Sequence, residues 1–544
     1  MHYLTYDIKG IQPYIFRIQR LKYIVGGSAL VGHFDRFIAA NMKNNLFSGG
    51  GKGAFECEVI EEVKLLQQQL RKKAHEFGFD IAFGHSVDYS EAANCADDIY
   101  PYLPQQMEGH PCPESGLYPV DDSRSLEQRK EHELVALRRH EDYRFHYEKE
   151  FIGTITLPDE IAHYKSVFFH NVDGESRGSA FSERDRHDGR CGAAAIGDRN
   201  RWAIIAMDGN DMGSQFRVQS AKTNNQIPKT WIRHMSTQLD ECTRNAFKAG
   251  LQTVINSWLT RADRIADCVY GDTLHLPLRP LVVGGDDIIV LCHSSYAMEF
   301  VKAVCDQLRK LSSEAHQAWT KDPKNVDSTE LWPATGGQLT ISAGVLFAPV
   351  SLPLATAIPY AESLLASAKN RGREGTPLPG HPSPECLDWE CVTSSLLEHP
   401  ANMRQREMLF LDNDIHEKVS LTCRPYTLEK FKELEKLCDK YADKGTFPRN
   451  LTHQVLTELR KSYWERKVYS TRIAKSHRLL HNDLDEPQTL GHNNTSRWRM
   501  SSESHSKSKD STAYPLRETD VLDALLLLEE GHRMSKTTLP GQES

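Results

Sequence analysis

The sequence predicts an α+β protein with two related sheet-and-helix units, followed by a helical C-terminal part. Two observations lead to this prediction. The order strand, helix, glycine-tipped hairpin, helix occurs near the N-terminus and returns on a larger scale after residue 201. Beyond residue 400, apolar residues recur at helical spacing. The chain of 544 residues is also too long for one hydrophobic core, so we expect several domains.

The first unit is expected within residues 1–105. Its segment YLTYDI (3–8) is typical of a short strand, and the apolar spacing over 12–42 predicts a helix interrupted at Gly26-Gly27. FSGGGKGAFECEVI (47–60) predicts a hairpin with a glycine tip, and the amphipathic EEVKLLQQQLRKKAHEFG predicts the helix after it. Residues 106–200 then form an expected insertion, with a Pro- and Gly-rich loop, a charged helix and a polar, mobile connection.

The second unit is expected at 201–395. WAIIAMDGNDMG is a buried strand running into a turn, a helix follows over 230–259, and a hairpin contains Gly-Gly-Asp-Asp. A helix over 296–319, the strand QLTISAGVLFAP and the helix PLATAIPYAESLLASAKNRG complete the unit. The repeated order indicates an internal duplication, although the two units share little residue identity.

The C-terminal region divides into three predicted parts. Residues 396–485 are expected to be a helical domain, because YTLEKFKELEKLCDKY places its leucines on one face and a second helix spans 451–480. Residues 486–516, rich in Ser, His, Asn and Lys, predict a flexible linker. Residues 517–544 contain a short apolar helix, DVLDALLLLEE, which we expect to dock on the body or on a partner.

Composition favours a cytoplasmic protein without membrane association. No apolar run reaches the roughly 18 residues of a membrane span, and the N-terminus lacks the pattern of a secretory signal. The twelve cysteines contain no CxxC pair, which fits reduced thiols better than disulfides. A net charge of −8 argues against non-specific nucleic-acid binding. It leaves room for a phosphate substrate, since a metal ion inverts the local field.

The hairpin LVVGGDDIIVLC predicts a metal and phosphate site. Gly284 and Gly285 let the backbone approach a ligand closely. Asp286 and Asp287 are adjacent carboxylates backed by apolar residues, so they repel each other unless a cation lies between them. Carboxylates of this kind suit Mg²⁺ or Mn²⁺, which bridge to substrate phosphates. The alternative is a solvated turn, because Gly and Asp are both common turn residues.

Asp208 ends the strand AIIAMDGNDMG. A central strand and its neighbouring hairpin end at the same edge of a sheet, so we expect Asp208 beside Asp286 and Asp287. There the three acids would share two metal ions that clamp the oxygens of a phosphoryl displacement. We expect phosphate oxygens to bind the backbone at the start of the next helix, at Gly209, Asn210, Asp211 and Gly213.

Two cations follow on the helix AESLLASAKNRGREG. Lys369 and Arg373 are four residues apart and share a helix face. Their position near the helix C-terminus also has a structural explanation, the helix dipole. If the helix packs beside the hairpin, both reach a triphosphate.

Together these segments resemble the palm domain shared by GGDEF-type nucleotide cyclases and the large polymerase subunit of type III CRISPR effector complexes. GGDD in place of GGDEF favours the CRISPR branch. DIKGIQPYIFRIQRLKYIVGGSALVGHFD is similar to the opening of that subunit's first palm, and FSGGGK to its degenerate hairpin. CRPYTLEKFKELEKL and FPRNLTHQVLTEL resemble its C-terminal helical domain.

The resemblance implies two ferredoxin-like palm domains and a nucleotidyltransferase activity. In the second palm, Asp208, Asp286 and Asp287 would hold Mg²⁺ or Mn²⁺, two per active site. The first palm, with Gly51 and Lys52 in place of acids, would bind a second nucleotide without metals. Ser28 would be a ribose or phosphate contact there.

The family converts ATP into cyclic oligoadenylates for antiviral defence, releasing pyrophosphate as a 3′-hydroxyl attacks an α-phosphate. Implied partners are other CRISPR effector subunits, guide RNA and target RNA. Two other readings stay open: an RNA-binding scaffold subunit with weak or lost catalysis, and a GGDEF-like cyclase that uses GTP.

Three departures from the family accompany the resemblance. Asn210 stands where the family often has a second acid, which leaves the geometry of the second metal open. The N-terminal HD nuclease is expected to be missing, and His187-Asp188 is interpreted as part of a loop. A zinc site between the palms is not expected, because that region offers only His110, Cys112 and Cys191.

Overall fold

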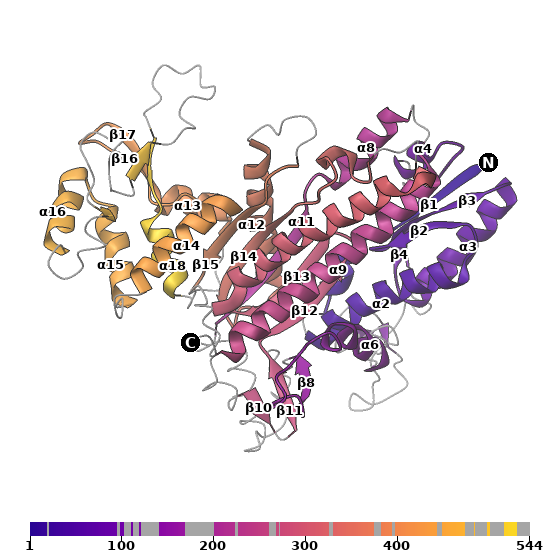
Figure 1. Ribbon diagram of the computed structural model, residues 1–544, viewed down its shortest axis with the longest axis horizontal. Helices are drawn as coiled ribbons and strands as arrows, with labels where there is room; N and C mark the ends of the chain where they lie inside the picture. The colour runs from indigo at the N-terminus through magenta and orange to yellow at the C-terminus, as the bar shows by residue number, and fades with distance from the viewer. Residues whose placement is uncertain are drawn as a thin grey trace.

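The computed structural model confirms the α+β class, with two sheet-and-helix units in series and a C-terminal part beyond them (Figure 1). The residues that the structure describes are 1–18, 21–94, 98–102, 110–111, 119–120, 141–168, 201–223, 227–260, 268–270, 272–325, 330–374, 382–393, 398–442, 449–473, 483–484, 498–500 and 516–529.

The first unit is a five-stranded antiparallel sheet in the order β2-β3-β1-β4-β5. Its central strand is buried over Leu4, Thr5 and Tyr6, and Ile8 is buried further along. The elements are β1 (His2–Lys9), α1 (Ile11–Phe16), α2 (Leu21–Asn41), β2 (Asn45–Gly49), β3 (Lys52–Cys57), α3 (Ile60–Glu76), β4 (Asp80–Ser86), α4 (Tyr89–Asn94) and β5 (Asp98–Tyr100).

The predicted helix break at Gly26-Gly27 is wrong. Helix α2 continues through both glycines, and the interruption lies earlier, between Phe16 and Leu21. Gly27 has a packing role instead: a Cβ there would lie 3.2 Å from the Ile15 Cα of α1. The absence of a side chain at Gly27 therefore lets α2 pack closely against α1, while α2 itself stays one continuous helix.

The second unit has a six-stranded sheet, in the order β12-β13-β9-β14-β15-β18. Helices α9 and α11 lie side by side across its strands, and α12 packs on β9, β14 and β15 (Figure 1). The elements are β9 (Arg201–Gly209), α8 (Met212–Lys222), α9 (Lys229–Leu259), β12 (Leu278–Gly284), β13 (Asp287–His293), α11 (Ala297–Lys321), β14 (Ile341–Pro349), α12 (Leu354–Glu374), β15 (Cys386–Cys391) and β18 (Tyr426–Thr427).

The strand registers reveal the internal duplication that the element order predicted. In the first hairpin Gly49 pairs with Lys52, and Lys52 pairs with Asp7 of the central strand. In the second hairpin Gly284 pairs with Asp287, and Asp287 pairs with Asp208 of the central strand. The two units thus share one ferredoxin-like topology, β2-β3-β1-β4 against β12-β13-β9-β14, in which Lys52 replaces an acid.

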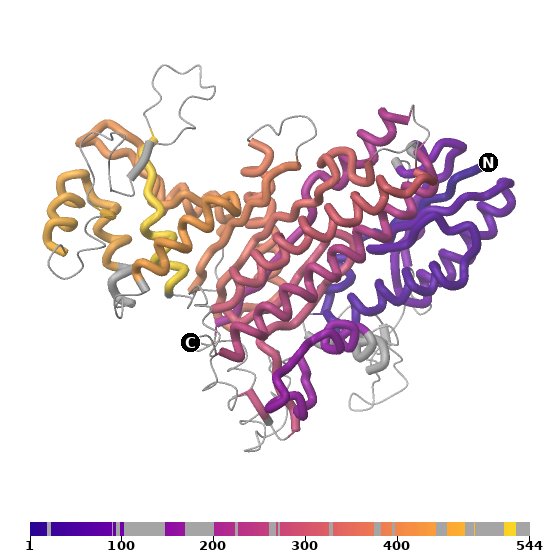
Figure 2. Tube along the Cα trace, viewed as in Figure 1, coloured from indigo at the N-terminus to yellow at the C-terminus, as the bar shows by residue number. Residues whose placement is uncertain are grey.

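The long helices join the two units. Helix α9 packs against β2 of the first unit, and α2 packs against β12 of the second. Arg233 on α9 donates to the Asn45 carbonyl at 2.9 Å, and Lys229 forms an ion pair with Glu56. Figure 2 shows the indigo first unit directly beside the magenta second unit. The arrangement brings the two hairpins to a common interface.

The C-terminal part was predicted to be helical, but it is not purely so. It also contains a four-stranded sheet, β16-β17-β20-β19, and the expected helix over 451–480 is two shorter helices. The elements are α13 (Pro400–Glu407), β16 (Leu409–Asp412), β17 (Glu417–Ser420), α14 (Leu428–Ala442), α15 (Arg449–Leu459), α16 (Tyr463–Ile473), β19 (Trp498–Met500), β20 (Leu516–Thr519) and α18 (Val521–Glu529). Helix α18 packs on α14 and α15, which confirms that the apolar segment docks on the body.

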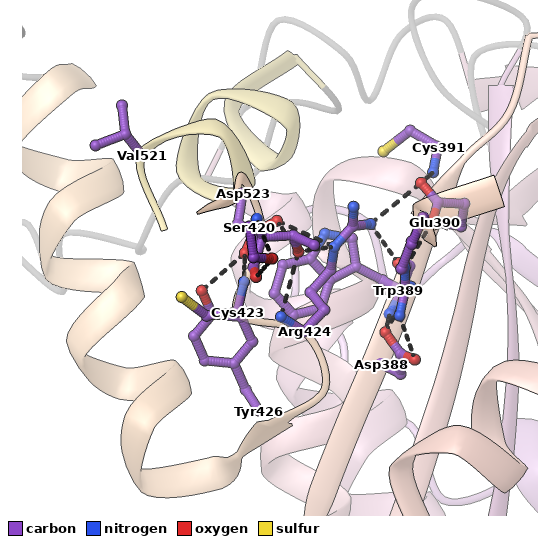
Figure 3. Close-up of polar contacts among 12 residues, drawn as sticks. Asp388, Trp389, Glu390, Cys391, Ser420, Cys423, Arg424, Tyr426, Val521 and Asp523 are labelled. Atoms are coloured by element: carbon purple, nitrogen blue, oxygen red, sulfur yellow. Dashed lines mark hydrogen bonds and ion pairs between the residues drawn. The ribbon is translucent and has the colours of Figure 1, made fainter. Parts of the chain in front are cut away.

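A buried ionic cluster connects α18 to the edge of the second sheet (Figure 3). The Arg424 guanidinium lies between Asp523 of α18 and Glu390 of β15, at 3.0 and 3.1 Å. Tyr426 donates a hydrogen bond to the same Asp523 at 2.9 Å. The neighbouring Arg404 binds Asp388 with both terminal nitrogens. The cluster therefore fixes the C-terminal part on the second unit through desolvated charges.

The insertion is described only in part. Its charged helix is present as α6 (Glu141–Ile152), and β8 (Lys165–Phe168) forms a small sheet with β10 (Val269–Tyr270) and β11 (Thr273–Leu276). No helix within the described residues is both long and apolar enough to span a bilayer. The polar connection 172–200, His187-Asp188, Cys112, Cys191 and almost all of the linker 486–516 lie outside the described residues.

Candidate active site

The tip of the second hairpin is held rigidly by α9. Gly285 has a φ of 61°, a left-handed conformation that favours glycine. Its amide donates to Asp240 Oδ1 at 3.0 Å, and Asp240 in turn accepts from Arg244 Nε at 2.7 Å. Gly284 lies next to these two side chains. The turn that carries the acids is therefore anchored by a helix of its own unit.

The three predicted acids come together at this tip. Asp208 and Asp287 are register partners on β9 and β13, and the Asp286 carboxyl lies within hydrogen-bonding reach of Asp208. Gly209 makes room for this arrangement, since a Cβ there would lie 3.0 Å from the Asp286 Cβ. The hairpin and the end of the central strand thus form one acidic centre.

The acids perturb one another. Burial raises the pKa of Asp286 strongly, and the negative charges of Asp208 and Asp287 raise it further. Asp287 lies at the exposed end of the hairpin, yet its pKa is raised to about 7, because surrounding protein displaces water and Asp208 repels its charge. The centre holds more negative charge than its protein surroundings neutralise.

This excess of negative charge predicts that Asp287 destabilises the folded protein to an extent that depends on pH. Its folded-state pKa lies above the ordinary value of 3.8, so between about pH 4 and pH 7 the folded protein binds more protons than the unfolded chain, and stability falls as pH rises. We expect Asp287→Asn to raise the Tm by a few degrees at pH 8 in EDTA, and hardly at all at pH 4. Differential scanning fluorimetry measures both, with the exposed Asp306→Asn as control. An equal gain at both pH values would contradict the electrostatic explanation.

Lys369 reaches the acidic centre from α12. Its ammonium forms an ion pair with Asp208 and donates to the Gly209 carbonyl at 2.8 Å. It also opposes the rise in the pKa of Asp287. Arg373 lies one turn further along, exposed in the last turn of the same helix. The structure therefore places Lys369 at the acids and Arg373 towards solvent.

The turn after Asp208 is fixed by side chains that point away from the acids. Asn210 is buried, donates to Thr340 Oγ1 at 3.1 Å and accepts from Ser342 Oγ at 3.0 Å. Asp211 has a φ of 59° and accepts from the Ser383 amide at 3.1 Å. Both side chains brace the start of α8. The Asn210 amide donates to the Thr340 carbonyl at 2.9 Å, so a phosphate contact of this turn stays a prediction for the amides that follow it.

Gly213 lies in the first turn of α8, with no other atom within 4 Å of where its Cβ would be. The open space at Gly213 fits the predicted approach of a phosphate to this turn.

The first unit places a cation, and not an acid, near the same acidic centre. Lys52 lowers the pKa of Asp287, which places this lysine within electrostatic range of the acids. Beside it, the Gly51 amide donates to Asp35 Oδ2 at 3.0 Å, and burial raises the pKa of Asp35 to about 7. Ser28 is buried in α2, near the Tyr147 hydroxyl of α6. A cation thus replaces the acids at the equivalent hairpin.

The donor set fits a magnesium-type cation. In the described residues, no three His, Cys, Asp or Glu side chains converge on one point in the manner of a complete metal cage. Asp208 and Asp286 are nevertheless in contact, and the raised pKa of Asp286 reports uncompensated charge. Mg²⁺ is commonly held by one or two carboxylates, with water and substrate phosphates as its other ligands.

Sequence reasoning did not identify Asp240, Asp35 or Glu362. Asp240 and Asp35 each accept a hydrogen bond from a hairpin amide, and Glu362 contributes to the electrostatics of Asp287. All three lie on amphipathic helices, where an acid is usually a solvated surface residue. Only the helix-to-hairpin packing distinguishes them.

Comparison with known proteins identifies the second unit. Residues 201–376 match the family model of Cas10/Cmr2, second palm domain, which confirms the predicted resemblance to the large subunit of type III CRISPR complexes. No curated protein matches the chain in sequence.

Similar solved structures include Csm1 in T. onnurineus, at 13% identity and a TM-score of 0.47, covering 98% of this chain and 70% of that chain. The Csm1-Csm4 cassette in complex with cA3 has 12% identity and a TM-score of 0.46, with the same coverage. The Csm1-Csm4 subcomplex in the type III-A CRISPR-Csm interference complex has 14% identity and a TM-score of 0.47, covering 97% and 69%.

Proposed function

We propose that this chain, whose residues 201–376 form a second palm domain of the Cas10/Cmr2 family, is a nucleotidyltransferase that joins ATP through 3′–5′ linkages. Its products would be cyclic oligoadenylates or a cyclic dinucleotide, acting as antiviral signals in the cytoplasm. The observation that carries the proposal is the contact of Asp208 with Asp286 and Lys369 at the hairpin tip. Paired acids beside one lysine are suited to a metal-bound triphosphate.

In this proposal the acids, the lysine and the turn have separate roles in the reaction. Asp208, Asp286 and Asp287 would hold Mg²⁺ or Mn²⁺, two ions per site, which supply charge neutralisation at the reacting phosphate. Lys369 would contact the triphosphate, and the turn from Gly209 to Gly213 would orient it. The 3′-oxygen of one nucleotide attacks the α-phosphorus of another, and pyrophosphate leaves with the bonding electrons. Catalysis of this kind consists largely of positioning and charge stabilisation.

Lys52 would act from the first palm. It occupies the position equivalent to Asp287, so the first hairpin cannot hold a metal ion in the same way. A nucleotide at this hairpin would be bound by a cation and by Ser28, without metals. The two palms would then present two nucleotides to one acidic centre.

The test is incubation of the purified chain with radiolabelled ATP or GTP and Mg²⁺ or Mn²⁺, beside Asp286→Ala/Asp287→Ala. A phosphatase-resistant product from ATP, lost in the variant and in EDTA, is the expected result. Product from GTP alone would favour a GGDEF-like cyclase.

The same assay is run with the chain assembled on other CRISPR effector subunits, guide RNA and target RNA. Product only in that assembly would identify a regulated subunit. Silence in both preparations would overturn the proposal and leave an RNA-binding scaffold.

A further inference from the structure

Glu362 is an acid of α12 with an unmet hydrogen-bonding capacity. Its Oε1 atom is buried and has no hydrogen-bond partner, while the residue as a whole is partly exposed. A buried carboxylate oxygen without a donor is costly. Lys369 follows seven residues later, two turns along and on the same face of the helix. The side chain of Glu362 therefore lies on the face of α12 that serves the acidic centre.

The electrostatics of Asp287 support this placement. Lys369 lowers the pKa of Asp287 and Glu362 raises it, so both act on the same carboxyl. Burial also raises the pKa of Glu362 itself. Glu362 is thus a fourth acid within electrostatic range of the hairpin tip. It lies two turns before Lys369 on the same face of α12.

Close packing of α12 on the sheet fixes the position of Glu362. A Cβ at Gly344 of β14 would lie 2.2 Å from the Ala361 carbonyl oxygen, so only glycine lets the helix rest there. Gly344 pairs with Ala206, two residues before Asp208 on the central strand. The residue after Ala361 is therefore held at the level of the acidic centre by backbone packing.

The first palm provides an internal comparison. Gly84 of β4 pairs with Thr5, two residues before Asp7, and a Cβ at Gly84 would lie 2.0 Å from the Ala92 carbonyl oxygen. Ala92 is thus the counterpart of Ala361, and Ala93 is the counterpart of Glu362. The palm whose hairpin lacks acids also lacks this glutamate. Glu362 accompanies Asp286 and Asp287, as a member of the active site would.

The chemistry of the group narrows what it can bind. An ionised glutamate only accepts hydrogen bonds, so it does not face a triphosphate, whose oxygens are acceptors as well. Lys369 is already engaged with Asp208 and Gly209. Near the reacting phosphate, the donors that a nucleotide offers are its ribose hydroxyls. We propose that Glu362 accepts a hydrogen bond from a ribose hydroxyl of a nucleotide bound at the acidic centre, an inference that rests on the function proposed above.

Binding of ATP, 2′-deoxyATP and 3′-deoxyATP tests this contact. Isothermal titration calorimetry with Ca²⁺ in place of Mg²⁺ is run on whichever preparation forms product, unaltered and as Glu362→Ala. We expect Glu362→Ala to weaken ATP binding about 10- to 100-fold, the range for a hydrogen bond to a charged group. In the unaltered protein, one deoxy analogue should bind about 10- to 100-fold more weakly than ATP. In Glu362→Ala, the same analogue and ATP should bind equally well. Which analogue behaves so identifies the hydroxyl.

Two further variants guard the interpretation. Glu374→Ala removes an exposed acid from the last turn of the same helix, with 62% of its side chain exposed, and should leave ATP binding unchanged. Glu362→Gln keeps the size and one acceptor oxygen, and should recover part of the affinity.

The ribose contact would be overturned if, for both analogues, removing the hydroxyl weakens binding by the same factor in Glu362→Ala as in the unaltered protein. If the protein still binds ATP in that case, the proposed function stands. Failure of the unaltered protein to bind ATP at all would overturn the proposed function and this inference with it.

Discussion

Asp208→Asn is expected to lower the rate of phosphodiester formation by about 10³-fold, because it removes a charge with three partners. Asp208 pairs in register with Asp287 and lies in contact with Asp286. It is also the ion-pair partner of Lys369. A neutral amide at this position is expected to weaken cation binding and leaves Lys369 without its charged partner, although the lysine still donates to the Gly209 carbonyl. Product formation from ATP at saturating Mg²⁺ measures the loss.

The matched control is Asp211→Asn, in the same turn and with the same change of charge. The Asp211 carboxyl accepts from the Ser383 amide and its backbone has a left-handed φ of 59°, a conformation that Asn tolerates. We expect its rate to stay within a few fold of the unaltered protein. Equal losses in the two variants would mean that the turn needs negative charge in general. Full activity in Asp208→Asn would remove this residue from the catalytic centre.

The acidic centre was predictable because short-range patterns determine it. A strand with Asp208 near its end and a hairpin that turns at Gly285-Asp286 have few ways to pair, and the observed register places Asp208 opposite Asp287. Lys369 was predicted from its helical spacing with Arg373, and its packing beside the acids is a tertiary result. Glu362 was missed, because on an amphipathic helix it has no signal beyond that of a surface acid.

Long-range features were the least predictable. The strand β20 pairs with β17 almost a hundred residues earlier in the chain, and four-residue strands give only weak alternation. The C-terminal sheet therefore could not be recognised, and the region was predicted as helical. Likewise, the glycines at 26 and 27 were interpreted as a helix break, although Gly27 serves close packing on Ile15. In both cases the structure depends on a contact between separate elements that the local sequence pattern does not show.

The duplication explains why one centre faces two different hairpins. Topology and register are shared, and Lys52 occupies the position of Asp287. The interface packs each long helix against an edge strand of the opposite unit. The first unit keeps Asp7 at the position of Asp208, but its hairpin carries Lys52 in place of an acid, and this lysine lies within electrostatic range of the acids of the second unit. Under the proposed function, the two units would therefore contribute different groups to one site.

Arg424→Ala is expected to destabilise the attachment of the C-terminal part by about 3–5 kcal/mol, the cost of leaving a buried charge without its partner. Arg424 is fully buried between Glu390 and Asp523, and Asp523 also accepts from Tyr426 and Thr422 (Figure 3). Without the guanidinium, burial penalises the Asp523 charge, whose pKa is raised already. Guanidinium denaturation followed by tryptophan fluorescence, to which Trp389 beside Tyr426 contributes, measures the change.

The control for that prediction is Arg406→Ala in the same part of the chain. Arg406 binds Glu398 and Glu407 at the surface, with 61% of its side chain exposed, so water replaces its partners and we expect a much smaller cost than for Arg424→Ala. A second variant, Arg424→Met/Asp523→Leu, removes the charges of both residues and should recover much of the loss, because the remaining acid, Glu390, keeps its ion pair with Arg404. If Arg424→Ala costs no more than Arg406→Ala, the cluster does not hold α18 on the second unit. If the double variant is as unstable as Arg424→Ala, the loss comes from packing volume and not from charge.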